Sequence, residues 1–371
     1  MVLPSMIQSA LQRHQREIDR ALRDAIAGAA TGSGTGDTAP YYGQMQYHLG
    51  WVDANFMPAS RKTGKRLRPT LLLLAYEAAG AWGLADDPSG DSSYLERALP
   101  AAAAIELTHN FTLIHDDIVD GDAVRHHQAT LWKLWGIPQA INTGDGMFVL
   151  ARLTLWGVLD KGVEPAIAAR LGAVLDRACL VIADGQYLDI SFEQRQDISV
   201  AMYLDMISRK TAALMSGATE MGALLGTRNE ETIARLRDFG HAVGIAFQVR
   251  DDLLGVWATT AELGKTPAGD IYRRKKSLPV LHALEHANSH DRQALKEIYQ
   301  QEAPLQAEQV KEVLAIMERT QSRTYCRDFL AQQCQQAYTA LASVPRNSSP
   351  VSARALDDMK SLVHFVAEEI L

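Results

Sequence analysis

Two short segments rich in aspartate contain the residues most able to do chemistry. The first, from Leu113 to Asp122, contains Asp116, Asp117 and Asp120. An α-helix turns once in about 3.6 residues, so Asp116 and Asp120 would share one face, where their like charges repel each other. In an isolated helix such a pair costs about 0.2–0.5 kcal/mol. A bound cation would turn this repulsion into attraction, so the spacing favours a metal site.

The second segment, from Phe247 to Gly255, repeats the pattern with Asp251 and Asp252. Carboxylate oxygens are the ligands that magnesium prefers, particularly where a substrate diphosphate completes its coordination shell. Either segment alone is also compatible with a solvated helix face, because acidic surface runs are common. The apolar residues that flank both pairs favour the metal site.

Basic residues are placed so that they could meet a polyanion. Lys65, Arg66 and Arg68 lie together, and further cations follow at Lys210, Lys265 and Lys275. Arginine binds phosphate oxygens with a planar fork and lysine with a compact charge. Each group alone is more often a solvated face or a charge at a helix end. In combination with the acidic segments, they indicate diphosphate chemistry.

The elements that must position these residues are predicted to be helices. Apolar residues recur with helical spacing, as in Ile167, Leu171, Val174 and Leu175, and strand-like alternation is nearly absent. We expect a single all-α domain over residues 1–371, with an N-terminal helical extension and loop at about 1–40. The breaks rich in Gly, Pro, Ser or Asp are too short to separate domains. They are Thr31 to Pro40, Gly83 to Ser93, Leu263 to Gly269 and Val344 to Pro350.

Composition limits the class of protein. The 371 residues are 47% hydrophobic, which is enough for a large core, and the net charge of -7 argues against a nucleic-acid or anionic-membrane partner. The N-terminus lacks the apolar segment of a secretory signal, and the apolar run from Leu71 to Tyr76 is far shorter than a membrane span. Cys179, Cys326 and Cys334 are odd in number and lack metal-ligand spacing. These features predict a cytoplasmic protein.

The two acidic motifs, together with the segment from Gly64 to Pro69, occur here in the order typical of the trans-isoprenyl diphosphate synthase family. The sequence resembles that family from about Lys62 to Lys276. The resemblance implies that Asp116, Asp120 and Asp251 are magnesium ligands. Catalytic roles are implied for those three and also for Asp117, Lys210 and Asp252. Asp252 is expected to orient the metal ligands without contacting the metal itself.

The same resemblance implies two diphosphate sites. The residues that match the isopentenyl diphosphate site are Lys65, Arg68, His109 and His126. Those that match the allylic diphosphate site are Arg125, Lys210, Thr211, Gln248, Lys265 and Lys275. Gln186 and Asp189 resemble a Gly-Gln-x-x-Asp element that the family places nearby.

The sequence departs from the family pattern at two places. Gly255 stands where many relatives have a third aspartate in the second motif, so the metal contact there is expected to rest on Asp251 alone. Arg125, His126 and His127 stand where Arg-Arg-Gly is usual. Because the unperturbed pKa of histidine is about 6.5, isopentenyl binding is expected to be weaker or pH-dependent.

The family resemblance implies a large helical bundle around a central cavity, with the acidic motifs facing each other at its mouth. It also implies three magnesium ions per active site and a homodimer. Phe111, five residues before Asp116, and the small Thr112 beside it resemble the chain-length positions of enzymes that make geranylgeranyl diphosphate. Farnesyl and geranylfarnesyl diphosphate are the neighbouring products. Phe111 is also compatible with ordinary core packing.

Other functions fit the sequence less well. A terpene cyclase of the same helical class would ionise one diphosphate and would need no second site such as Lys65, Arg68 and His109. A noncatalytic subunit would not need the acidic residues, because a fold does not imply a function. An acidic helical interaction protein would explain none of the ordered motifs. We therefore predict a prenyltransferase that joins isopentenyl diphosphate to allylic diphosphates.

Overall fold

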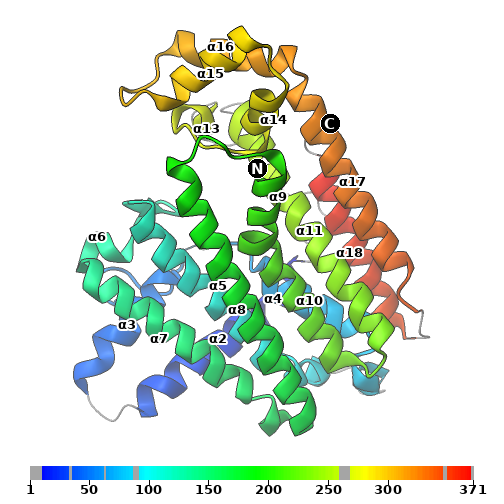
Figure 1. Cartoon of the computed structure of the whole chain (residues 1–371). Coiled ribbons are helices and arrows are strands. Elements are labelled where there is room, and N and C mark those ends of the chain that lie inside the picture. Colours follow the sequence, from blue (N-terminus) through cyan, green and yellow to red (C-terminus); the bar gives the residue numbers. More distant parts are fainter. Residues whose placement is uncertain are drawn as a thin grey trace.

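The structure, a computed structural model, describes residues 11–32, 36–61, 64–86, 92–258, 268–345 and 349–368. It is a helical bundle, as predicted, in which α14 to α16 lie together at one end and α17 and α18 run along one side (Figure 1). Within these residues, no helix is both long enough and apolar enough to span a lipid bilayer. Burial raises the pKa of Cys179 and Cys334 to about 11, and both thiols are free.

The helices of the bundle differ widely in length. Their bounds are α2 Gln15–Gly32, α3 Ala39–His48, α4 Leu67–Ala78, α5 Leu99–Val119, α6 Leu131–Trp135, α7 Ile137–Trp156, α8 Pro165–Gln194, α9 Val200–Ile207, α10 Ala213–Gly226, α11 Glu230–Trp257, α13 Gly269–Tyr272, α14 Leu278–His286, α15 Ser289–Gln300, α16 Ala307–Arg319, α17 Ser322–Ala342 and α18 Pro350–Glu368. Short 3-10 turns occur at η1 Gly36–Thr38, η2 Ala81–Asp86, η3 Ser92–Arg97 and η4 Leu159–Lys161. Thus the predicted breaks at Thr31 to Pro40 and Gly83 to Ser93 are partly helical.

Helix α5 lies at the centre of the bundle and ends in the first acidic motif. Its four alanines from Ala101 to Ala104 are fully buried, and their small side chains allow α4 and α7 to pack against the helix. The helix ends at Val119, where the backbone N–H of Asp120 donates to the carbonyl of Asp116. Gly121 follows with a φ of 68°, a conformation that glycine adopts at little cost. The acidic motif is therefore held at the end of a well-anchored helix.

A short hairpin follows α5 and carries the predicted Arg125. Strands β1 Val124–Arg125 and β2 Gln128–Ala129 pair antiparallel. The sequence did not predict these strands, because two residues are too few for an alternating pattern. The connecting residues His126 and His127 have φ values of 49° and 63°. Both therefore occupy the left-handed region that turns of this length require.

Helices α9 and α10 are joined without a loop by the π-helical turn η5 Ser208–Ala212, which contains Lys210 and Thr211. Such turns are rare and are frequent at functional sites. In α8 the facing residue is Gly185, and a Cβ atom there would lie 2.4 Å from the backbone nitrogen of Lys210. The glycine of the Gly-Gln-x-x-Asp element is therefore required for the close approach of α8 to this turn.

Candidate active site

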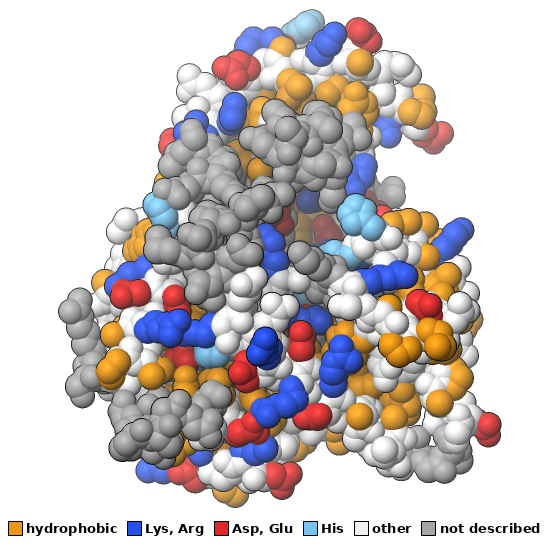
Figure 2. Space-filling model, turned by 180° about the vertical axis from the view of Figure 1, so that it is seen from behind, with side chains coloured by type: hydrophobic (Ala, Val, Ile, Leu, Met, Phe, Trp, Pro, Cys, Tyr) orange, Lys and Arg blue, Asp and Glu red, His pale blue; other side chains and the backbone are white. Residues whose placement is uncertain are grey.

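A cavity of about 460 Å³ lies between the two acidic motifs. Its walls come from α4, α5, the β1–β2 hairpin, the η5 turn and α11. Figure 2, which views the molecule from the side opposite to Figure 1, shows charged side chains of both signs around a hollow. Many of the residues predicted from the sequence line it, namely Lys65, Arg68, His109, Asp117, Arg125, His126, Thr211, Gln248 and Asp251. The bundle thus brings together segments that are far apart in the chain.

The first acidic motif has two differently placed sets of carboxylates. Asp117 is 2% exposed, and the Nε of Arg125 donates to its Oδ1 at 2.6 Å. Burial raises the pKa of Asp117 to about 6, and Arg125 offsets this effect only in part. Burial also raises the pKa of Asp116 and Asp120, and the Lys210 ammonium lowers it on both. Asp117 therefore binds Arg125 directly, whereas Asp116 and Asp120 both interact electrostatically with the Lys210 ammonium.

In the second motif the two aspartates also differ. Asp251 lines the cavity, and burial together with the charge of Asp252 raises its pKa to about 6. Asp252 is fully enclosed and accepts hydrogen bonds from the Tyr203 hydroxyl, from Nε2 of Gln248 at 3.2 Å and from the backbone N–H of Leu278 at 3.3 Å. Asp251 is thus placed to contact a ligand, whereas Asp252 fixes the positions of Tyr203, Gln248 and the backbone of Leu278.

The predicted isopentenyl residues Arg68 and His109 contact each other directly. The Nη1 of Arg68 lies 3.0 Å from Nε2 of His109. Burial, followed by the charges of Arg68 and Arg125, lowers the pKa of His109 well below its usual value. Because arginine can only donate, neutral His109 accepts this hydrogen bond and orients the guanidinium.

The C-terminal helix supports the same wall. The ring of Phe365 in α18 lies beneath two cations, with the Lys65 ammonium 5.4 Å and the Arg250 guanidinium 4.5 Å from its centroid. Cations over an aromatic face are attracted by its quadrupole. Phe365 was not predicted, because it lies outside both acidic motifs and outside the basic segment from Gly64 to Pro69. Arg250 lies within the second acidic segment, but no role was predicted for it there.

A buried ion pair in the wall of the cavity was also not predicted. The Nη1 of Arg66 donates to Oε1 of Glu106 at 2.7 Å, and both side chains are buried. Asn110 donates to the same Glu106 oxygen at 3.1 Å. The available signal was a lone glutamate within the apolar start of α5, since a buried carboxylate needs a partner. Nearby, burial together with the charges of Arg125 and His126 lowers the pKa of His48 to about 3.

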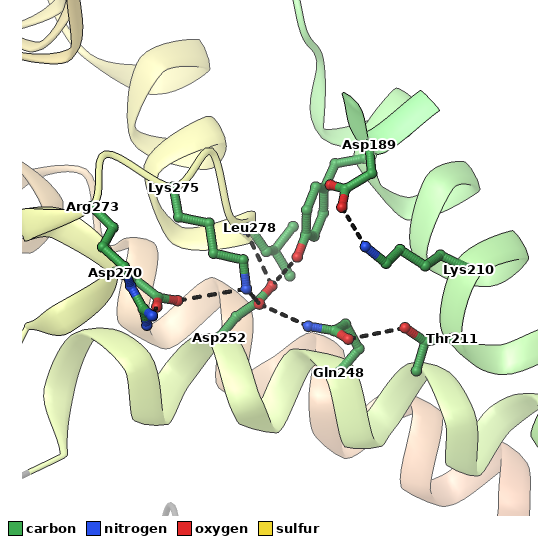
Figure 3. Close-up of polar contacts among 10 residues, drawn as sticks. Asp189, Lys210, Thr211, Gln248, Asp252, Asp270, Arg273, Lys275 and Leu278 are labelled. Atoms are coloured by element: carbon green, nitrogen blue, oxygen red, sulfur yellow. Dashed lines mark hydrogen bonds and ion pairs between the residues drawn. The ribbon is translucent and has the colours of Figure 1, made fainter. Parts of the chain in front are cut away.

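Three of the allylic-side residues, Lys210, Thr211 and Gln248, meet around the π-helical turn, as Figure 3 shows. The Lys210 ammonium donates to Asp189 of α8, and the Thr211 hydroxyl donates to Oε1 of Gln248 in α11 at 3.0 Å. Lys275 lies across from them, with its Nζ 3.5 Å from Asp252. Lys265 lies outside the described residues.

The predicted chain-length residues lie one helical turn or more from the acidic motif. The ring of Phe111 packs edge-to-face on Phe148 of α7, with centroids 4.9 Å apart, and the Thr112 hydroxyl donates to the carbonyl of His109 at 2.7 Å. Neither Phe111 nor Thr112 is among the residues that line the 460 Å³ cavity. Their effect on product length therefore stays a prediction.

The acidic residues fit magnesium by donor type. In the part of the chain that the structure describes, no three His, Cys, Asp or Glu side chains form a metal site by themselves. The raised pKa values of Asp116, Asp120 and Asp251 nevertheless show carboxylates whose charges are poorly compensated. A hard divalent cation with oxygen ligands would supply this compensation.

Comparison with known proteins gives a consistent result. The sequence model of the family described as Polyprenyl synthetase matches residues 50–317. A geranylgeranyl diphosphate synthase of Mycobacterium tuberculosis is 37% identical over 301 residues, which cover 81% of this chain and 80% of the relative. A (2E,6E)-farnesyl diphosphate synthase of Mycobacterium bovis is 40% identical over 245 residues, 66% of this chain and 64% of the relative. The crystal structure of a polyprenyl synthetase from Streptomyces coelicolor A3(2) superimposes with a TM-score of 0.82 at 33% identity and covers 97% of this chain and 99% of that one.

Proposed function

The chain belongs to the polyprenyl synthetase family and is a short-chain prenyl diphosphate synthase, and from this premise we propose that its main product is geranylgeranyl diphosphate. The observation that carries the assignment as a synthase is the cavity between the two acidic motifs, which is lined by Asp117 and Asp251 and by the cations Lys65, Arg68 and Arg125. Lys210 and Lys275 are not part of this lining and contact Asp189 and Asp252 beside it. Two groups of cations are what a reaction between two diphosphates needs.

Isopentenyl diphosphate would bind to Lys65, Arg68 and His109, with His126 at the edge of the cavity. The allylic diphosphate would bind to a second set of residues, namely Arg125, Lys210, Thr211, Gln248 and Lys275, together with Lys265, which lies outside the described residues. Asp116, Asp120 and Asp251 would hold magnesium, which the family uses, and we propose three ions per site. Bound magnesium would neutralise charge that develops on the leaving diphosphate.

In the proposed reaction the C–O bond of the allylic diphosphate breaks, and diphosphate leaves with the electron pair. The double bond of isopentenyl diphosphate then attacks the allylic cation, and the released diphosphate takes the proton that is lost from the new product. The protein supplies no nucleophile in this scheme. Its residues bind and orient the two substrates, and they stabilise the negative charge of the leaving group.

The assignment of a twenty-carbon product rests on Phe111 and on its ring partner. Phe111 and Phe148 together place two aromatic rings between α5 and α7. A growing chain that passes Thr112 would meet them. The relatives include both geranylgeranyl and farnesyl diphosphate synthases, so a fifteen-carbon product is the competing outcome.

The test is incubation with magnesium, isopentenyl diphosphate and each allylic primer in turn, followed by measurement of product length. We expect twenty-carbon product from the five-, ten- and fifteen-carbon primers. Phe111→Ala should lengthen the products while the first condensation continues. Farnesyl diphosphate as the end product, or an active Phe111→Ala enzyme with unchanged products, would contradict the assignment.

We also propose that the enzyme is a homodimer that pairs through α7 and α8, which pack against each other. Both helices expose large apolar side chains, including Leu153 at 63%, Leu180 at 66% and Tyr187 at 71% exposure. Apolar patches of this kind are typical of protein interfaces. Light scattering should give twice the chain mass, and Leu153→Glu should yield monomers, whereas the control Leu84→Glu on another surface should not. A monomeric wild-type protein would refute the dimer.

A further inference from the structure

Gly255 occupies the third acidic position of the second motif, and another carboxylate fills the space beside it. A Cβ atom at Gly255 would lie 2.3 Å from Oδ2 and 2.5 Å from Cγ of Asp270. Both distances are far below van der Waals contact, so no side chain at position 255 can coexist with Asp270 as it stands. Gly255 lies within the regular helix α11 and does not need the conformational freedom of glycine. The glycine therefore serves to make room.

Asp270 lies in the short helix α13 and is 6% exposed. Its Oδ2 lies 3.7 Å from Nζ of Lys275, and its Oδ1 lies 3.3 Å from Nη2 of the exposed Arg273. The backbone N–H of Lys275 also donates to the carbonyl of Asp270 at 2.9 Å. Asp270 thus contacts Lys275 through both its side chain and its backbone.

Lys275 is held from a second direction by Asp252, as Figure 3 shows. Asp252 is itself fixed by Tyr203, Gln248 and the backbone of Leu278. A lysine side chain is flexible, and an ammonium with one partner can occupy many positions. Two carboxylates on different helices leave the ammonium far fewer positions. Burial lowers the pKa of Lys275, but the charges of Asp252 and Asp270 outweigh burial and raise it, so the group stays cationic.

We propose that Asp270 is a positioning residue for the allylic diphosphate site. Its carboxylate occupies the space beside Gly255 and supplies the negative charge that a third aspartate of the motif would have supplied there. Together with Asp252, it positions the Lys275 ammonium to bind the diphosphate. This inference rests on the proposed function, in which Lys275 contacts the allylic substrate. The second motif has glycine at its third acidic position, and in this proposal Asp270 supplies a carboxylate there from outside the motif.

The first test is a double-mutant cycle with Asp270→Asn, Lys275→Ala and the double variant, measured as KM for each substrate with the other saturating. Asp270→Asn should raise the allylic KM about tenfold, the size of one charge-assisted hydrogen bond. The isopentenyl KM should stay within about twofold. In the Lys275→Ala background, Asp270→Asn should add nothing, because the two residues act as one unit. Additive losses, or equal changes in both KM values, would overturn the proposal.

The second test moves the carboxylate. Gly255→Ala should displace Asp270 and raise the allylic KM in the same direction as Asp270→Asn. Gly255→Asp combined with Asp270→Ala should recover part of the loss of Asp270→Ala alone. The control Arg273→Ala removes the exposed partner of Asp270 and should leave both KM values unchanged, because such pairs contribute little. If the allylic KM of the Gly255→Asp/Asp270→Ala variant is no lower than that of Asp270→Ala, a carboxylate at position 255 cannot replace the one at position 270, and the proposal is refuted.

Far-UV circular dichroism and thermal unfolding of each variant separate loss of positioning from loss of fold. A wild-type enzyme that does not elongate any allylic primer would refute the proposed function itself. An active wild type with an Asp270→Asn variant of normal allylic KM would refute only the role of Asp270.

Discussion

Asp251 and Asp252 are neighbours in the chain, yet helix α11 turns successive side chains about 100° apart. One side chain therefore lines the cavity, while the other is enclosed by Tyr203, Gln248 and Leu278. At the scale of single residues, one carboxylate is therefore available to bind a ligand, and the other stabilises the packing of the helices around it.

Substitution of Asp251 should mainly lower activity, whereas substitution of Asp252 should mainly lower the stability of the fold. Asp251→Ala should lower kcat by about 100-fold or more, because a metal ligand is lost, with unfolding changed by less than about 1 kcal/mol. Asp252→Ala leaves buried donors without a partner and should lower the free energy of unfolding by about 3 kcal/mol. Steady-state kinetics and denaturant unfolding measure the two effects. Equal loss of stability in both variants would contradict this division.

At the scale of elements, the allylic-side residues depend on a backbone contact between two helices. The π-helical turn η5 presents Lys210 to Asp189 and Thr211 to Gln248. Gly185 permits this because its missing side chain leaves room for the backbone of Lys210. The contact is between main chains, so it cannot be relieved by a change of rotamer.

Gly185→Ala should therefore push η5 away from α8 and raise the allylic KM about tenfold or more, as a displaced ligand set would. Gly172→Ala is the matched control in the same helix. A Cβ atom there would meet only Trp156, at an ordinary 3.7 Å. This control should keep full activity and stabilise the helix by about 0.5–1 kcal/mol. Normal kinetics in Gly185→Ala would show that the turn can move without cost.

The β1–β2 hairpin gives a second prediction at this scale. His127 has a φ of 63° where turns of this type favour glycine. His127→Gly should relieve this strain and raise the free energy of unfolding by about 0.5–1 kcal/mol. His127 does not line the cavity, so the isopentenyl KM should not change. Thermal unfolding measures the gain, and a destabilised variant would mean that the His127 side chain makes a contact that offsets the strain.

At the scale of the whole molecule, the cavity collects carboxylates and cations from helices that span much of the chain. Asp117 comes from α5, Asp251 from α11, Arg68 from the first turn of α4, and Lys65 from the residues just before that helix. Neither an anion nor a cation alone can satisfy both kinds of charge. A metal–diphosphate pair can satisfy both.

Magnesium and inorganic diphosphate should therefore stabilise the protein together more than either does alone. At about 100 times the dissociation constant, binding adds about 2.7 kcal/mol and should raise the Tm by about 3–4 °C. Thermal unfolding with magnesium, with diphosphate in chelator, and with both provides the comparison, and magnesium sulfate is the control. An equal rise from diphosphate in chelator would show that the cations suffice without metal.

The helical class and the two acidic motifs could be predicted because they depend on short-range patterns. Asp116 and Asp251 fall into such patterns, and so do the cations beside Pro69. Asp270 could not be identified in this way, because its relation to Gly255 exists only after α13 packs on α11. The pairing of Arg66 with Glu106 and the π-helical turn also depend on tertiary contacts, which local propensity does not encode.

The π-helical turn has a consequence for chain register. A turn of this type contains one residue more than the same stretch of α-helix. Deleting any one residue from Ser208–Ala212 would restore a regular helix and rotate α9 relative to α10 by about 100°. Lys210 and Thr211 could then no longer reach Asp189 and Gln248 together. The number of residues in this turn, and not only their identity, is thus part of the active site.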